Sequence, residues 1–190
     1  MQKSICLKNG QIFVYQNLNT KKQDYKWEKR FLFTAIALFL LATAQTFAQQ
    51  LQRHKPVPEI TLPQANGEEL KLSSLRGKYV LIDFWASWCM PCKKENRYLK
   101  QAYKELKGKN FVILSVSIDR PKDKDAWLDT IKMEGMVWYN VWDSEGKIAN
   151  TYGVTSIPAP FLIDPEGNLL SQGENLRTDD LLKTLKKYIK

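Results

Sequence analysis

The sequence predicts an α/β fold, a central mixed β-sheet flanked by helices. Two continuous apolar runs, Tyr79–Phe84 and Phe111–Ile118, have the length and composition of strands buried on both faces. Amphipathic helical segments follow each run, and a turn-linked strand pair stands near the C-terminus. Strands that alternate with helices in this way favour a sheet covered by helices.

The first elements of the domain are a hairpin and a short helical turn. Residues 59–62 and 69–72 alternate in polarity around Asn66-Gly67, which is a strong turn signal. One serine of Ser73-Ser74 is expected to cap a helical turn that ends before Gly77. This part of the chain therefore predicts an N-terminal β-hairpin ahead of the first buried strand.

A helix is expected between the two buried strands. Apolar residues recur at helical spacing over residues 91–106, and Pro91 is tolerated in a first turn. After the second buried strand, the pattern predicts a further helix at 123–133 and a strand at 137–141.

The C-terminal elements are read from periodicity and turn signals. Thr178 is expected to cap the final helix. The expected order is a short helical piece at 148–152, a strand at 161–164, a turn at 165–168, its hairpin partner at 169–171 and an amphipathic helix at 178–189.

Residues 1–48 are predicted to be a secretory signal peptide with an unusual N-terminal extension. A basic cluster at 26–30 precedes the apolar run Phe31–Ala44, and the segment ends small-x-small at Ala48. The run is about 14 residues long, short of the ~20 that span a bilayer. Cleavage is expected after Ala48, with Ala44 as a second site, and an uncleaved membrane anchor is the alternative.

The predicted organisation continues with a linker at 49–58 and one domain at 59–190. Pro56 and Pro58 keep the linker extended. Export would place the domain in the cell envelope, with the periplasm as the expected compartment, and membrane association is expected only if the signal segment stays uncleaved. No function is assigned to Cys6, which lies in the extension.

The charge of the chain does not indicate a nucleic-acid partner. The net charge is +9, but without residues 1–48 the chain has 22 basic and 18 acidic residues, a net charge of +4. Lysine-rich stretches at 104–109 and 183–190 lie on helical patterns, where a solvated face explains them. Glycine-rich phosphate loops are absent, so no cofactor is expected. We expect a monomer.

Cys89 and Cys92 are the most informative residues. Cys89 follows an apolar strand and a short turn, where a helix should begin. Unpaired N–H groups and the positive end of the helix dipole at that position stabilise a thiolate, which is the reactive form of cysteine. Cys92 lies one turn further on, so the pair can exchange two electrons as a dithiol and a disulfide.

Other uses of a Cys-x-x-Cys pair fit this chain less well. A structural zinc site needs four ligands, and the only further cysteine and histidine, Cys6 and His54, both lie outside the predicted domain. A disulfide that closes so short a loop removes little entropy from the unfolded chain, so it would be a poor staple. A c-type haem site needs histidine after the second cysteine, where Lys93 stands.

The run from Asp83 to Cys92, the later Ile157-Pro158 and the order of elements resemble the thioredoxin superfamily. More narrowly, residues 56–190 are similar to its exported TlpA/ResA-like thiol–disulfide oxidoreductases. The resemblance implies a thioredoxin fold with an N-terminal hairpin and an extra helix–strand insertion. It also implies that Cys89 attacks the substrate, that Cys92 resolves the mixed disulfide, and that Pro158 is a cis-proline beside them.

The resemblance also assigns roles to two carboxyl groups. Asp83 matches the buried acid beneath the active site, whose pKa burial should raise and which takes a proton from Cys92. A hydrogen-bonded core aspartate without a proton role is the alternative. Ser115 occupies the place of the lysine that partners this acid in classical thioredoxins, so a larger shift is expected. Glu95 matches a glutamate that tunes both thiols, although glutamate is also simply favoured near a helix N-terminus.

The expected substrate-binding residues surround the cysteines. Trp88 should form an apolar lip, and the remaining members are Met90, Pro91, Ile157 and Pro158. The leading hypothesis is an exported enzyme that reduces disulfides of protein substrates, with apocytochrome c as a typical target of the group, and takes electrons from a membrane donor. The alternatives are a disulfide oxidase or isomerase and a redox-inactive binding module. A peroxidase is disfavoured because its Thr-x-x-Cys loop is absent.

Overall fold

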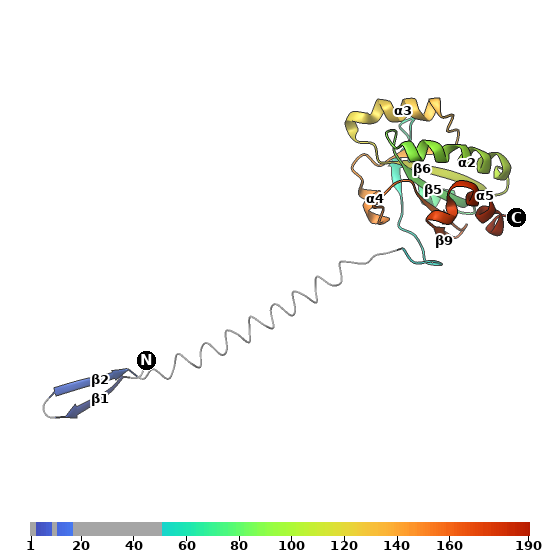
Figure 1. The fold of residues 1–190 in the computed structure, drawn as a ribbon. Helices are drawn as coiled ribbons and strands as arrows, with labels where there is room; N and C mark the ends of the chain where they lie inside the picture. The colour runs from blue at the N-terminus through green and yellow to red at the C-terminus, as the bar shows by residue number, and fades with distance from the viewer. Residues whose placement is uncertain (1–2, 9–10, 17–50) are drawn as a thin grey trace. The chain divides into compact units, whose positions relative to one another are not determined.

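The computed structural model describes residues 3–8, 11–16 and 51–190. The chain divides into two units, residues 1–48 and 49–190. In the first unit, β1 (Lys3–Lys8) and β2 (Gln11–Gln16) form an antiparallel hairpin (Figure 1). The basic cluster, the apolar run and the cleavage site of the predicted signal peptide lie in residues 17–50, outside the described residues, so the signal peptide stays a prediction.

The second unit is built on a mixed five-stranded sheet, which confirms the predicted fold class. The strand order is β7-β6-β5-β8-β9, so β5, the strand that precedes the cysteines, is central. β5, β6 and β7 are parallel, whereas β8 runs antiparallel to both β5 and β9. The strands are β5 (Tyr79–Trp85), β6 (Phe111–Ser117), β7 (Tyr139–Trp142), β8 (Ala159–Ile163) and β9 (Leu169–Gln172).

Helices and a small hairpin cover the sheet (Figure 1). The predicted N-terminal hairpin is present as β3 and β4, although each strand is only three residues long. These elements are β3 (Thr61–Pro63), β4 (Glu69–Lys71), α2 (Met90–Leu106), α3 (Lys124–Met133), α4 (Lys147–Thr151), α5 (Thr178–Tyr188) and the 3-10 turns η1 (Leu72–Leu75), η2 (Pro121–Asp123) and η3 (Glu174–Leu176). Within the described residues, no helix combines the length and apolarity that crossing a membrane requires.

Two apolar cores lie on opposite faces of the sheet because side chains alternate along each strand. On β5, Val80, Ile82 and Phe84 contribute to the core that also contains the hairpin and α4. Leu81 and Trp85 contribute to the other core, together with α2, α3 and α5. Alternation places Asp83 on this second face, the face of the two cysteines.

The predicted helix caps at serine and threonine are wrong. The N–H of Ser73 donates to Glu59 Oε1 at 3.0 Å, and Ser74 donates its hydroxyl to the Lys71 carbonyl, so neither side chain caps η1. Thr178 makes no side-chain cap, and the N-cap of α5 is Arg177. In both places a glutamate from another part of the chain accepts from the first N–H groups, which local sequence does not reveal.

The start of β7 also differs from the prediction. Val137 is 73% exposed, and pairing with β6 begins only at Tyr139, opposite Leu114. The chain emerges there from a turn at Gly135, so the apolar residues before Tyr139 lie outside the strand.

Candidate active site

The two cysteines lie where β5 passes into α2. Cys89 is the N-cap of α2, and its sulfur accepts the N–H of Cys92 at 3.1 Å. The turn before it is closed by the N–H of Cys89, which donates to the Ala86 carbonyl at 3.0 Å. The two sulfurs form a disulfide. A thiolate at Cys89 would keep the N–H donor and gain the field of the helix, both of which lower a thiol pKa.

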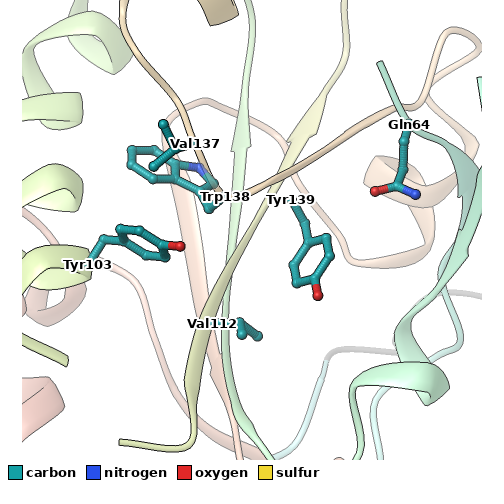
Figure 2. Close-up of a pocket in the computed structure, with 6 residues that line it drawn as sticks. All are labelled: Gln64, Tyr103, Val112, Val137, Trp138 and Tyr139. Carbon is teal, nitrogen blue, oxygen red and sulfur yellow. The ribbon is translucent and has the colours of Figure 1, made fainter. Parts of the chain in front are cut away.

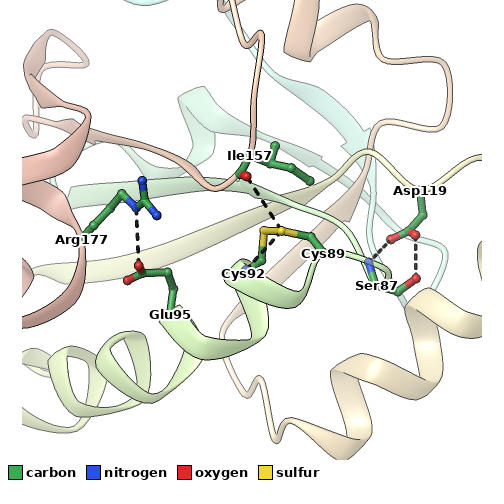
Figure 3. The surroundings of a disulfide bond; sticks show 7 residues. All are labelled: Ser87, Cys89, Cys92, Glu95, Asp119, Ile157 and Arg177. Atoms are coloured by element: carbon green, nitrogen blue, oxygen red, sulfur yellow. Dashed lines mark hydrogen bonds and ion pairs between the residues drawn. A yellow bond between two sulfur atoms is a disulfide. The ribbon is translucent and has the colours of Figure 1, made fainter.

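The loop before β8 lies directly beside the disulfide (Figure 3). The Ile157–Pro158 peptide bond is cis, as the resemblance implied. The Ile157 carbonyl oxygen lies 3.9 Å from Cys89 Sγ. A sulfur in a disulfide has no proton to donate, so this approach is a contact between the loop and the redox group. Ile157 and Pro158 are both half-buried, so part of each remains open to a partner.

The surface around the disulfide is apolar. Cys89 and Cys92 are 4% and 3% exposed, so burial alone does not distinguish the two sulfurs. Trp88 is 59% exposed and Met90 62% exposed, and these are two of the four large apolar side chains exposed among the described residues. Pro91 is also exposed. Exposed apolar groups grouped at one place are typical of an interaction site.

Asp83 is buried beneath this site without a cation beside it in the sheet. In the strand register it lies between Ser115 of β6 and Pro160 of β8. The pKa of Asp83 is raised to about 8: burial is the largest cause, the nearby Glu95 carboxylate also raises the pKa, and the Arg177 guanidinium lowers it. The expectation of a raised pKa is confirmed, and desolvation is its main cause.

Ser115 connects the surroundings of Asp83 to a second part of the molecule. Its hydroxyl oxygen accepts the indole N–H of Trp138 at 2.8 Å. Trp138 lines a hollow of about 310 Å³ with Gln64, Tyr103 and neighbours on β6 and β7 (Figure 2). None of the predicted site residues lines this hollow.

Glu95 is buried and faces the start of α5, not solvent. Its Oε2 accepts the N–H of Thr178 at 2.8 Å, and its Oε1 lies 3.4 Å from Arg177 Nε (Figure 3). The guanidinium contact is an ion pair without hydrogen-bond alignment, since Arg177 Nε has no aligned acceptor. Glu95 therefore caps a helix other than its own. No local sequence pattern pointed to Arg177, which lies 82 positions after Glu95 in the chain.

A buried aspartate that sequence reasoning missed holds the segment before Cys89. Asp119 is fully buried and accepts three hydrogen bonds at 2.7–2.9 Å, from the N–H and hydroxyl of Ser87 and from the hydroxyl of Ser117 (Figure 3 draws the two from Ser87). Its carbonyl accepts the indole N–H of Trp142 on β7. The polar residues Ser117 and Asp119 at the end of an apolar strand are the signal that could have revealed it.

The described residues contain no group of three or more histidine, cysteine, aspartate or glutamate side chains that could hold a metal ion.

Comparison with known proteins agrees with this geometry. Residues 54–172 match the sequence profile of the AhpC/TSA family. The chain belongs to the AhpC/TSA family. The profile covers more than half of the chain and includes Cys89, Cys92 and Pro158. The predicted membership of the thioredoxin superfamily is thereby confirmed.

Relatives within the family are thiol–disulfide oxidoreductases. The chain is 30% identical to the thiol-disulfide oxidoreductase ResA of Bacillus subtilis, over 87% of this chain and 96% of the relative. A crystal structure of the thioredoxin domain of a thiol-disulfide oxidoreductase from Bacteroides vulgatus is 32% identical, with a TM-score of 0.68 over 74% of this chain and all of that one. A thiol-disulfide oxidoreductase from Bacteroides fragilis is 35% identical, with a TM-score of 0.65 over 71% and 100%. The predicted enzyme class, thiol–disulfide oxidoreductase, is confirmed.

Proposed function

We propose that this protein reduces disulfides of protein substrates outside the cytoplasm. The observation that supports this most directly is the placement of Cys89 at the start of α2, beside the cis-Pro158 loop and under an exposed apolar lip. An extended substrate segment can lie along that loop with its disulfide against Cys89. ResA relatives have the same enzyme class by name.

The reaction proceeds in two exchanges. The Cys89 thiolate attacks one sulfur of the substrate disulfide, which forms a mixed disulfide and releases the other substrate sulfur as a thiolate. Cys92 then loses its proton and attacks Cys89 Sγ. This step forms the Cys89–Cys92 disulfide, releases the second substrate thiol and completes a two-electron transfer from protein to substrate.

Asp83 is the group that we assign to the proton of Cys92. Its pKa of about 8 lies close to that of an ordinary thiol, so proton transfer from Cys92 to the ionised form of Asp83 is nearly balanced, and the fraction of Asp83 in that form grows as pH rises toward 8. Asp83 lies on the same face of the sheet as the cysteines and is shielded from bulk solvent. A water molecule between the two groups would complete the path.

The substrate contacts follow from exposure. We assign Trp88 and Met90 to the apolar lip, with Pro91, Ile157 and Pro158 along the edge of the disulfide. The residues Met90-Pro91 between the cysteines and Ile157 before the cis-proline resemble reducing members of the superfamily, which favours reduction over oxidation. Re-reduction would come from a membrane electron donor.

The domain organisation belongs to the same proposal. Export by residues 1–48 would deliver a monomeric domain, residues 59–190 behind the linker 49–58, to the cell envelope. Cleavage after Ala48 would release it, and retention of the segment would anchor it to the membrane.

The reduction potential of Cys89–Cys92 tests the direction of the reaction. A protein that begins at Gln49 would be equilibrated with glutathione or dithiothreitol buffers, and the oxidised fraction measured by alkylation. A potential near about −270 mV, at the reducing end of the range, supports a reductase. A potential near about −120 mV would indicate a strong oxidant and would replace the proposal with disulfide formation.

A further inference from the structure

Arg177 lies between two features of the site. On one side its Nε is 3.4 Å from the buried carboxylate of Glu95. On the other side it lines a hollow of about 290 Å³ together with Ser156, Pro158 and Gly173. That hollow, called the groove below, runs beside the cis-proline loop. The side chain of Arg177 is 25% exposed, so it is accessible from the groove and still close to the interior.

Charged side chains follow one another from the surface at Glu174, through Arg177 and Glu95, to the buried Asp83. Glu174 of η3 pairs with Arg177 Nη1 at 2.6 Å and is itself 86% exposed. Glu95 follows on α2, three residues after Cys92, and Asp83 on β5 feels both Glu95 and Arg177. Glu95 and Arg177 are the charged groups that shift the pKa of Asp83, and we call Asp83 and Glu95 the carboxyl pair. Arg177 is the cation among them.

We propose that Arg177 is a positioning residue that couples the groove to the carboxyl pair beneath the disulfide. It holds Glu95 against the first N–H of α5 and partly offsets the negative charge next to Asp83. Because the same guanidinium lines the groove, a substrate segment bound there changes the ion pair with Glu95. The resolving step then responds to occupancy of the groove. This inference rests on the proposed function, since it concerns the proton that leaves Cys92.

The test uses the reduced protein and 5,5′-dithiobis(2-nitrobenzoate), an aryl disulfide whose thiolate product is coloured. Attack by Cys89 releases the first aryl thiolate, and attack by Cys92 on the mixed disulfide releases the second. The rate of the second release is followed as a function of pH for the wild type and Arg177→Met. We expect the pH dependence of the second release to move upward by about half a pH unit in the variant, because a charge that lowers the pKa of Asp83 is removed.

Two control variants separate the effect of the Arg177 charge from the loss of any positive charge. Arg177→Lys keeps the positive charge and is expected to restore most of the wild-type profile. Lys183→Met removes a positive charge from an exposed position on α5, the helix that follows Arg177, and it should leave the profile unchanged. Equal shifts in Arg177→Met and Lys183→Met, or an unchanged profile in Arg177→Met, would overturn the coupling. If Arg177→Met does not fold, Arg177→Gln takes its place in the same measurement, with NMR titration of the Asp83 carboxyl as a second readout.

The role of the groove has its own readout. A cyclic disulfide peptide large enough to fill the groove replaces the aryl disulfide, and loss of Arg177 should slow the second step more with the peptide than with the aryl compound. If loss of Arg177 slows the second step equally with the peptide and with the aryl disulfide, the groove has no part in the coupling and Arg177 only holds Glu95. A wild-type protein that releases no second thiolate would instead refute the proposed function, whatever the variants do.

Discussion

Asp83 on β5 and Ser115 on β6 are partners in the parallel register of the sheet. The hydroxyl of Ser115 accepts the indole N–H of Trp138. Because serine is uncharged, Ser115 supplies no positive charge to the Asp83 carboxyl. Pro160 is the partner on the other side of Asp83 and has no N–H. The carboxyl is therefore desolvated between two neighbours that do not compensate it, which is the physical origin of its raised pKa.

The stability of the protein should fall as pH rises from about 4 to about 8. An unfolded aspartate has a pKa of 3.8, and Asp83 in the fold has a pKa of about 8. Between these values the folded state binds a proton that the unfolded chain has lost, so stability from this group is complete at the acid end and decreases toward pH 8. Asp83→Asn should remove that slope and be more stable than the wild type above pH 8, by an amount on the order of a few kcal/mol. Urea denaturation of both oxidised proteins at several pH values measures it, and parallel curves would contradict the raised pKa.

The same substitution should slow the resolving step. Asparagine cannot accept the proton of Cys92, and a positioned general base contributes about a hundredfold or more. We expect Asp83→Asn to reduce the second aryl thiolate release by that order above pH 8, where the Asp83 carboxyl is ionised and can accept the proton, and by less at neutral pH. The first release, by Cys89, is the internal control and should change far less. A normal second phase would leave Asp83 as a core residue without a proton role.

Removal of the second cysteine should trap partners. Cys92→Ser leaves Cys89 able to attack and unable to be released, so mixed disulfides should accumulate in cells that express it from the full-length chain. Non-reducing electrophoresis and mass spectrometry identify them. Cys89→Ser is the matched control and should trap little. Comparable trapping by both variants would reverse or remove the assigned roles.

The hydrogen bonds of Asp119 predict a stability effect. Asparagine at this position presents one accepting oxygen and one donating nitrogen to three donors, which leaves at least one buried donor unpaired. Asp119→Asn is therefore expected to destabilise the fold by about 1–3 kcal/mol. Ser117→Ala removes the hydroxyl that donates to Asp119 and accepts the Asp119 N–H, so it should also destabilise the fold. The two can be compared by thermal or denaturant unfolding, and equal stability of Asp119→Asn and wild type would disprove the role of the network.

The parts of the fold that depend on local patterns were predictable. The apolar run of β5, the helix from residue 90 onward and the cysteine at its N-cap follow from periodicity and capping alone. The predicted caps of η1 and α5 were wrong because the N–H groups there donate to Glu59 and Glu95, which come from distant positions in the chain. Local propensity favours a serine or threonine side chain as the cap of a helix. In this fold, tertiary contacts from glutamate side chains take that place.

In the site, too, residues that are close in the sequence were predictable and contacts between distant residues were not. Asp83 and the cysteines follow one another within a single strand–turn–helix segment, so the sequence places them together. The partners of Glu95 and Ser87 are joined only by the folded topology, since Arg177 lies at the start of the last helix and Asp119 after the neighbouring strand. Single charged residues in loops have no pattern that distinguishes them from solvated ones.

The hydrogen bond from Trp142 to the Asp119 carbonyl has a consequence for any attempt to shorten this protein. Trp142 belongs to β7, and its ring stacks on Trp127 of α3. The inserted helix and strand therefore support Asp119, which in turn holds the turn before Cys89. A minimal domain without residues 121–142 would still contain every cysteine, carboxyl and proline of the site. It would lose the Trp142 hydrogen bond to Asp119, the residue that accepts from Ser87 just before Cys89, so the insertion contributes to the placement of the redox site.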